Sequence, residues 1–136
     1  MNPFFLFKGD QLWIRRDANG VGCLFDADPE RFAFAESVGD AALAALSDEP
    51  PSHGAELVGL RALVDLVPSE VAAGAGLARQ LLHWRLTHRF CGVCGAPLVR
   101  LASERAMSCP GCGHLAYPRI NPVVITLVYR GDQIAM

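Results

Sequence analysis

Hydrophobic and polar positions alternate in short blocks at the start of the chain, which predicts a small antiparallel sheet. Apolar residues dominate positions 4–7, 11–14 and 21–25. Turn-forming sequences separate these blocks, Lys8-Gly-Asp in the first gap and Asp17-Ala-Asn-Gly in the second. Short apolar runs bounded by Gly, Asp and Asn are typical of strands joined by tight turns. We therefore expect three strands that form a meander.

The middle of the chain predicts helices and loops. Residues 40–46 are rich in Ala and Leu, which favours a short helix that the polar loop 48–54 ends. Residues 57–67 are expected to form a strand or a short buried segment. A longer helix is expected to begin at 68–70, because apolar or aromatic side chains then recur at helical spacing. These residues are Leu77, Leu81, Trp84 and His88.

The last twenty residues follow a different pattern. A stiff segment, 117–122, contains two prolines, and the β-branched run 123–129 predicts a strand followed by a turn at 130–132. An isolated hydrophobic hairpin is only marginally stable in water. We therefore expect residues 118–136 to open a domain whose remainder is absent from this chain.

These patterns predict an α+β fold with a small antiparallel-sheet domain, a connecting helix and further short units. The expected divisions are an amino-terminal α+β domain, the helix, a cysteine-bearing ribbon and an incomplete domain, at residues 1–76, 77–88, 89–117 and 118–136. A chain of 136 residues with 51% hydrophobic content can bury one modest core and form a second small unit that a metal ion stabilises. No apolar run approaches the ~20 residues of a membrane span, so no membrane partner is expected. We expect a cytoplasmic protein with reduced thiols.

Four cysteines form two Cys-x2-Cys pairs, which is the most specific chemical signal in the sequence. The pairs are Cys91-Gly-Val-Cys94-Gly and Cys109-Pro-Gly-Cys112-Gly. Such pairs are typical of one tetrahedral zinc site, and the glycines suit the tight turns in which backbone amides face thiolate sulfur. Two disulfides are the alternative, and they are typical of exported proteins. Four thiolates would fill the coordination sphere, so the expected Zn²⁺ ion is structural.

Charge is distributed unevenly along the chain. Residues 1–78 carry five basic side chains against twelve acidic ones, whereas residues 79–119 carry six arginines against Glu104 alone. This local excess of arginine favours an anionic partner near the ribbon, with phosphate as the obvious class.

Two sequence blocks carry a resemblance to a known family. The first runs from Leu81 through His-Trp-Arg-Leu-Thr-His-Arg-Phe to the first cysteine pair, and the second runs from Ser108 through the second pair to Tyr117-Pro-Arg-Ile-Asn-Pro. Together they resemble the NADH pyrophosphatase branch of the Nudix hydrolases. The resemblance implies a homodimer that hydrolyses the pyrophosphate of NAD(H), related dinucleotides or NAD-capped RNA to two mononucleotides.

The resemblance also implies where substrate contacts lie. Tyr117 and Glu104 match substrate-contacting residues of the family, and Arg61 and Lys8 match basic contacts from the amino-terminal domain. The family holds Mg²⁺ or Mn²⁺ on the glutamates of a Nudix box, Gly-x5-Glu-x7-Arg-Glu-x2-Glu-Glu, which does not occur here. No catalytic residue can therefore be assigned, and we expect the 136-residue chain alone to be inactive.

Other readings of the same residues stay open. Each predicted contact could be an ordinary surface or packing residue. A zinc ribbon with excess arginine could also be a nucleic-acid-binding module or a scaffold without catalysis. The hairpin at 96–108 carries only two arginines and no aromatic residue on which bases could stack, which disfavours nucleic acid.

Overall fold

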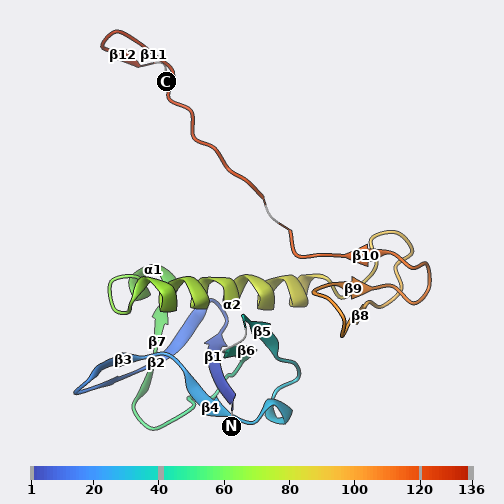
Figure 1. Ribbon diagram of the computed structural model, residues 1–136, viewed down its shortest axis with the longest axis horizontal. Helices are drawn as coiled ribbons and strands as arrows, with labels where there is room; N and C mark the ends of the chain where they lie inside the picture. Colours follow the sequence, from blue (N-terminus) through green and yellow to red (C-terminus); the bar gives the residue numbers. More distant parts are fainter. Residues whose placement is uncertain (1, 40–41, 120, 135–136) are drawn as a thin grey trace.

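The computed structural model describes residues 2–39, 42–119 and 121–134. A mixed sheet lies below a long helix, and the helix leads into a small ribbon that carries the four cysteines (Figure 1). The sheet contains seven strands. They are β1 (Asn2–Lys8), β2 (Gln11–Asp17), β3 (Gly20–Gly22), β4 (Phe25–Ala27), β5 (Glu36–Val38), β6 (Ala42–Leu46) and β7 (Ala55–Gly59). A 3-10 turn, η1 (Pro29–Arg31), follows β4.

The first three strands form the predicted antiparallel meander, but the two long strands β1 and β2 soon splay apart. They pair only at Phe7 with Leu12 and at Lys8 with Gln11. Beyond that point β3 pairs with the end of β2, and β4 pairs with the start of β1. A single chain segment thus bridges the gap between the splayed strands. The predicted third strand, 21–25, is this bridge, interrupted between β3 and β4.

The short helix predicted at 40–46 is wrong, because β6 occupies Ala42–Leu46; residues 40 and 41 lie outside the described residues. β6 runs parallel to β1, and its backbone pairs with positions 4–7 of that strand. Ala44 and Ala45 have no solvent exposure, and they pack into the cores on opposite faces of the sheet. Small side chains therefore fit β6 because it is buried between two packed faces, although the same residues favour a helix locally.

One face of the sheet is covered by the helix α2 (Ser69–Thr87), which begins where the sequence predicts (Figure 1). The strand or buried segment expected for 57–67 is a strand only over 57–59, the end of β7, and a short helix, α1 (Leu60–Leu63), then connects β7 to α2. The buried helix residues Ala75, Ala78 and Leu82 join Phe5, Phe7 and Ile14 of the sheet in one core. Gly74 faces Phe5, and an added Cβ there would come within 3.3 Å of the Phe5 ring. Small residues thus allow the helix to lie close to the sheet.

The opposite face of the sheet is covered by loop residues instead of a helix. Phe4, Leu6, Trp13 and Phe25 are buried there, and Phe32 packs against Phe4 with 5.0 Å between ring centroids. Burial on both faces explains why β1 reads as a continuous apolar run rather than an alternating one. Because both faces are packed, the sheet forms a rigid base for the helix and the segments that follow it.

Beyond α2, three two-residue strands form the ribbon sheet. They are β8 (Val99–Arg100), β9 (Met107–Ser108) and β10 (Leu115–Ala116), paired in the order β10-β9-β8. Backbone hydrogen bonds in knuckles and turns make up for the short strands, as between the Leu98 amide and the Arg89 carbonyl. The ribbon therefore depends on its cysteine site more than on strand pairing.

The strand predicted over 123–129 is not formed as such. Only β11 (Tyr129–Arg130) pairs, with β12 (Gln133–Ile134), and residues 121–128 lie extended without a strand partner. Ile125 is 97% exposed. A β-branched sequence favours extended backbone, but a strand needs a neighbour for its amides and carbonyls, and the described part of the chain supplies none here.

The predicted connecting helix, 77–88, is the second part of α2, which packs on the sheet through Ala75, Ala78 and Leu82. The four-part division of the chain itself stays a prediction. No helix within residues 2–39, 42–119 and 121–134 combines the length and apolar character needed to cross a bilayer.

Candidate metal centre and substrate groove

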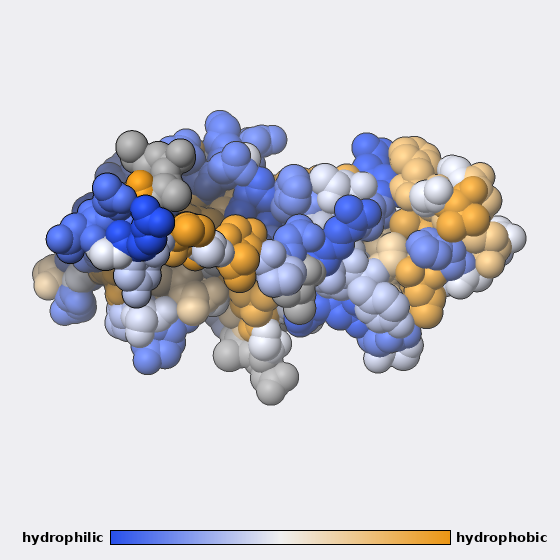
Figure 2. Space-filling model, turned by 90° about the horizontal axis from the view of Figure 1, so that it is seen from above, coloured by the Kyte–Doolittle hydropathy of each residue, from blue (hydrophilic) through white to orange (hydrophobic). Residues whose placement is uncertain are grey.

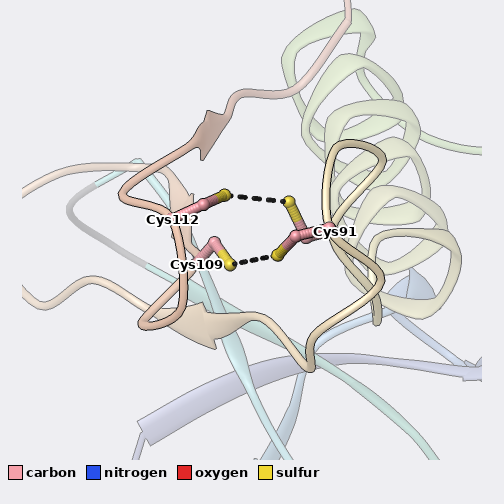
Figure 3. Close-up of side chains that lie close together, drawn as sticks. Cys91, Cys109 and Cys112 are labelled. Carbon is pink, nitrogen blue, oxygen red and sulfur yellow. Dashed lines mark hydrogen bonds between the residues drawn. The ribbon is translucent and has the colours of Figure 1, made fainter.

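The two cysteine pairs form two knuckles of the same backbone design. In each, the amide of a glycine donates to the carbonyl of the first cysteine at 2.9 Å, Gly95 to Cys91 and Gly113 to Cys109. Both glycines have φ of +75°, in the left-handed region that other residues rarely adopt. The Cys-x2-Cys-Gly sequence thus dictates each turn locally. The knuckles face each other, so that the labelled Cys91, Cys109 and Cys112 point into one space (Figure 3).

The four sulfurs are arranged as a tetrahedral metal site requires. Cys91 and Cys112 lie 3.6 Å apart at Sγ, Cys94 and Cys109 lie 3.4 Å apart, and all four atoms fall within 4.8 Å of one another. A tetrahedron with Zn–S bonds of about 2.3 Å has sulfur–sulfur edges of about 3.8 Å. All five cysteines of the chain are free, so the disulfide alternative is not realised. The donor set and its spacing therefore fit Zn²⁺.

Backbone amides prepare the site for thiolate. The amides of Cys94 and Val93 lower the pKa of Cys91 to about 6, because they donate hydrogen bonds to its sulfur. The pKa of Cys112 is raised to about 12: the His114 amide lowers it, but crowding by the Cys94 and Cys109 sulfurs outweighs that effect. Four sulfurs this close cannot all ionise without a cation between them. His114 supplies backbone contacts only and does not join the ligand group.

The knuckle glycines yield a prediction about stability. Gly95→Ala is expected to weaken the metal-bound ribbon by about 1–2 kcal/mol, because alanine pays a steric cost in the left-handed region. An added Cβ would meet nothing within 4 Å, so the cost is one of backbone conformation alone. Competition with a chelator of known zinc affinity measures it. Gly92→Ala in the same knuckle is the matched control, because Gly92 has neither a positive φ nor a close neighbour.

Arginines fasten the ribbon to the sheet domain around one buried carboxylate. Glu36 of β5 is 3% exposed, and the Nε atoms of Arg100 and Arg85 approach its Oε1 at 3.4 and 3.7 Å. Arg100 comes from the ribbon and also lies over the ring of buried Trp84. Arg105, the neighbour of Glu104, donates to the Ser37 carbonyl at 3.2 Å. Two elements far apart in sequence thus share one ion-pair cluster.

This cluster changes the interpretation of the arginine excess. Of the six arginines in 79–119, Arg79 pairs with Asp10, Arg85 and Arg100 pair with Glu36, and Arg105 binds a backbone carbonyl. Two acids of the amino-terminal domain, Asp10 and Glu36, therefore pair with three of the six arginines and offset part of the excess in this stretch. The sequence offered no signal for these pairs, because Glu36 and Arg100 lie 64 positions apart.

A groove of about 1030 Å³ runs along the side of α2 from the sheet domain to the ribbon. Its sheet end is formed by Asp10 and Leu60, and its ribbon end by His114 and Tyr117. The basic or potentially basic side chains in its lining are Arg79, His83, His88, His114 and Arg119. Asp10, its one acid, is paired with Arg79. The volume suits a nucleotide-sized ligand, and the charge suits an anionic one.

Buried donors without partners mark the middle of this groove. Trp84 is 4% exposed and its Nε1 has no hydrogen-bond partner, and the same holds for Nε and Nη1 of Arg79. From the sequence, Trp84 was recognised only by its helical spacing and Arg79 only as part of the arginine excess, so the groove itself was not predicted.

The structure brings together two of the four predicted substrate contacts. The Tyr117 hydroxyl donates to Glu104 Oε2 at 3.0 Å, and this carboxylate raises the pKa of Tyr117. Tyr117 lines the groove, while Glu104 lies on the loop between β8 and β9. Arg61 is exposed on α1 beside the groove residue Leu60. Lys8 ends β1, and its Nζ donates to the Asp48 carbonyl at 3.1 Å.

The cysteines are the one group of three or more His, Cys, Asp or Glu side chains close enough to hold a metal ion in the described ranges. These ranges do not assemble the carboxylates that Mg²⁺ or Mn²⁺ would require. The site described so far can hold one thiophilic ion and bind an anionic ligand.

Comparison with known proteins agrees with this division into a sheet domain and a cysteine ribbon. Residues 2–84 match the NADH pyrophosphatase-like rudimentary NUDIX domain, and residues 86–117 match the NADH pyrophosphatase zinc ribbon domain. These matches define a rudimentary NUDIX domain followed by a zinc ribbon. The chain belongs to the NADH pyrophosphatase family.

Individual relatives carry the name NAD-capped RNA hydrolase NudC. One from Deinococcus radiodurans is 44% identical over 63% of this chain, and one from Stutzerimonas stutzeri is 45% identical over 61%. A third, from Chromobacterium violaceum, is 31% identical over 96% of this chain. The matched parts make up 30%, 30% and 50% of those proteins, so the chain spans at most about half the length of these relatives.

Proposed function

We propose that this chain is the substrate-binding and zinc-holding part of an NAD(H) pyrophosphatase that splits NAD(H), and NAD-capped RNA, into two mononucleotides. The observation that carries the proposal is the basic groove along α2, which Tyr117 lines. Two other lining residues, Leu60 and Asp10, lie close in sequence to the predicted contacts Arg61 and Lys8. Its relatives are named as NAD-capped RNA hydrolases.

Each predicted contact has a role that its chemistry suits. Arg61 and Lys8 would neutralise the pyrophosphate, since cations form strong charge-assisted hydrogen bonds to phosphate oxygens. The Tyr117 ring offers a stacking face, and Glu104 accepts hydrogen bonds, here from Tyr117 and in the complex from a ribose hydroxyl or an amine. The Zn²⁺ ion of the four cysteines would hold the ribbon in shape and supply no chemistry, because four sulfurs leave no open position.

The hydrolytic part of this proposal lies outside the described residues. The divalent ions, Mg²⁺ or Mn²⁺, would be held by a Nudix box that these 136 residues lack. Residues 118–136 would open that domain, which is supported by the exposed apolar side chains of Val123, Val124 and Ile125. We further propose a cytoplasmic homodimer. Five free cysteines suit a reducing compartment. Figure 2 shows apolar surface at the ribbon end, the part of the chain in which Phe90 and Val93 are exposed.

A nucleic-acid module without catalysis receives less support. Arg100 and Arg105, the cations of the ribbon hairpin, are used within the chain, one on Glu36 and one on the Ser37 carbonyl. Phosphate contacts would have to compete with these internal partners.

A chimera tests the proposed function directly. Residues 1–136 would replace the corresponding part of the Chromobacterium violaceum relative, and NADH hydrolysis with Mg²⁺ or Mn²⁺ would be measured beside the chain alone. We expect activity in the chimera only. In the chimera, Arg61→Ala should lower kcat/KM about 10- to 100-fold, the effect of losing a hydrogen bond between charged groups. Arg31→Ala, in the distant turn η1, is the matched control.

Two outcomes would contradict the proposal. One is a chimera that binds zinc and has the circular dichroism of a folded protein, yet does not hydrolyse NADH. The other is an equal loss of kcat/KM in Arg61→Ala and Arg31→Ala, which would remove Arg61 from the substrate site.

A further inference from the structure

Glu104 lies on a loop that one arginine organises. Arg100 Nη1 donates to the carbonyls of Leu101, Glu104 and Ala106, the last at 3.3 Å. Within the loop, the Ala106 amide donates to the Glu104 carbonyl at 2.9 Å. Nη1 has two N–H donors, so at least one of them is shared between carbonyls. A guanidinium also has a donor on Nε that can bind a second partner at the same time, which the single nitrogen of lysine cannot do with the same geometry.

Arg100 is in turn held by the sheet domain. Its Nε lies 3.4 Å from both carboxylate oxygens of Glu36, and its Cζ lies 5.8 Å from the centroid of Trp84. Glu36 is 3% exposed, whereas the Arg100 side chain is 27% exposed. A buried carboxylate is costly unless it is paired, so Glu36 fixes the position of the arginine strongly.

We propose that Glu36 and Arg100 are positioning residues for the Glu104–Tyr117 contact. Glu36 holds Arg100 in place, and Arg100 holds the carbonyls of the loop. The loop in turn positions the Glu104 carboxylate, which accepts the hydrogen bond from the Tyr117 hydroxyl. The zinc site fixes the other end of the ribbon, but Glu104 lies on the far loop between β8 and β9, where Arg100 acts. The importance of this network for substrate binding rests on the proposed function, whereas its existence does not.

The ionisation of Tyr117 reports the network without any substrate. The chain contains two tyrosines, so Tyr129→Phe leaves Tyr117 as the single one. Its titration is then followed by the near-ultraviolet absorbance of the phenolate in the zinc-loaded full chain. Glu104→Gln in this background should lower the pKa of Tyr117, because it removes the carboxylate that raises it.

Arg100→Met should lower the Tyr117 pKa toward the value found with Glu104→Gln. The direction is diagnostic, since loss of a nearby positive charge would by itself raise the pKa of a phenol. Arg100→Lys keeps the positive charge, but its single nitrogen cannot bind Glu36 and the loop carbonyls from two separate atoms as Nε and Nη1 do, so it should lower the Tyr117 pKa as well. Arg100→Lys also provides the test of the proposal if Arg100→Met loses its zinc. Arg85→Met is the matched control, because Arg85 shares Glu36 but does not bind the loop carbonyls.

A double variant separates positioning by Glu36 from its charge. If Glu36 acts through Arg100, Glu36→Gln combined with Arg100→Met should shift the titration no further than Arg100→Met alone, whereas independent charge effects would add. The proposal is overturned if Arg100→Lys retains the Tyr117 pKa of the parent, or if Glu104→Gln does not change it. These titrations contain no dinucleotide, so a failure of the positioning proposal and a failure of the proposed function would be separate results.

Discussion

Cys91→Ser is expected to leave the chain without bound zinc and to unfold the ribbon while the sheet domain stays folded. A serine hydroxyl is a poor replacement for the thiolate that the amides of Cys94 and Val93 stabilise. Structural zinc contributes about 10–16 kcal/mol of apparent binding free energy in zinc-finger peptides, which is folding free energy for a unit of this size. The ribbon sheet has three two-residue strands and cannot replace that contribution.

Zinc content per chain and limited proteolysis mapped by mass spectrometry measure the two parts of this expectation. Cleavage should appear within 89–117 and leave the segment that carries β1 to β7 intact. Cys23→Ser is the matched control, since Cys23 is a buried free cysteine in the sheet core, away from the cluster. It should keep its zinc. A Cys91→Ser protein with unchanged zinc content and unchanged cleavage would show that the four-cysteine group is not a structural metal site.

The metal centre was predictable because its geometry is local. Each knuckle is specified within five residues, by two cysteines and the glycine whose φ of +75° closes the turn. Only the meeting of the two knuckles depends on longer connections, and the short hairpin between them allows few alternatives. The start of α2 was predictable for the same reason, since helical periodicity and the Pro68-Ser69 start lie in one continuous segment.

Features that depend on distant partners were missed. The sequence at 42–46 favours a helix by composition, but pairing with β1 makes it the strand β6. The apolar run at 123–129 favours a strand by composition, but the described residues give positions 121–128 no partner. In both cases local propensity is weaker than the presence or absence of a neighbouring strand.

The role predicted for the arginine excess was misleading for a similar reason. A stretch with six arginines and one acid suggests an external anion, yet Asp10 and Glu36, in a distant part of the sequence, supply internal partners for three of these arginines. Buried Glu36 could not be recognised in the sequence, because a single Glu between polar and apolar residues has no pattern. The groove was hidden for the same reason, since its lining comes from β1–β2, α2 and the ribbon together.

Leu82→Ala is expected to lower the free energy of unfolding of the sheet domain by about 2–5 kcal/mol, the range for removing a fully buried leucine. Leu82 has no solvent exposure and packs in the core between α2 and the sheet. Its helix neighbours on that core, Ala75 and Ala78, are small and allow the helix to approach closely, so Leu82 provides much of the apolar volume on the helix side. The rigid two-sided sheet cannot collapse to fill the space.

Urea unfolding followed by tryptophan fluorescence measures this loss, with Leu77→Ala as the matched control on the same helix. Leu77 is 40% exposed, so its truncation should change stability by about 0.5 kcal/mol or less. Zinc content should remain unchanged in both variants, because neither side chain contacts the cysteine site in the described structure. Equal losses in the two variants would mean that α2 does not bury Leu82 against the sheet. The groove, which α2 forms together with the sheet end and the ribbon, would then lack the fixed wall that the proposed substrate binding requires.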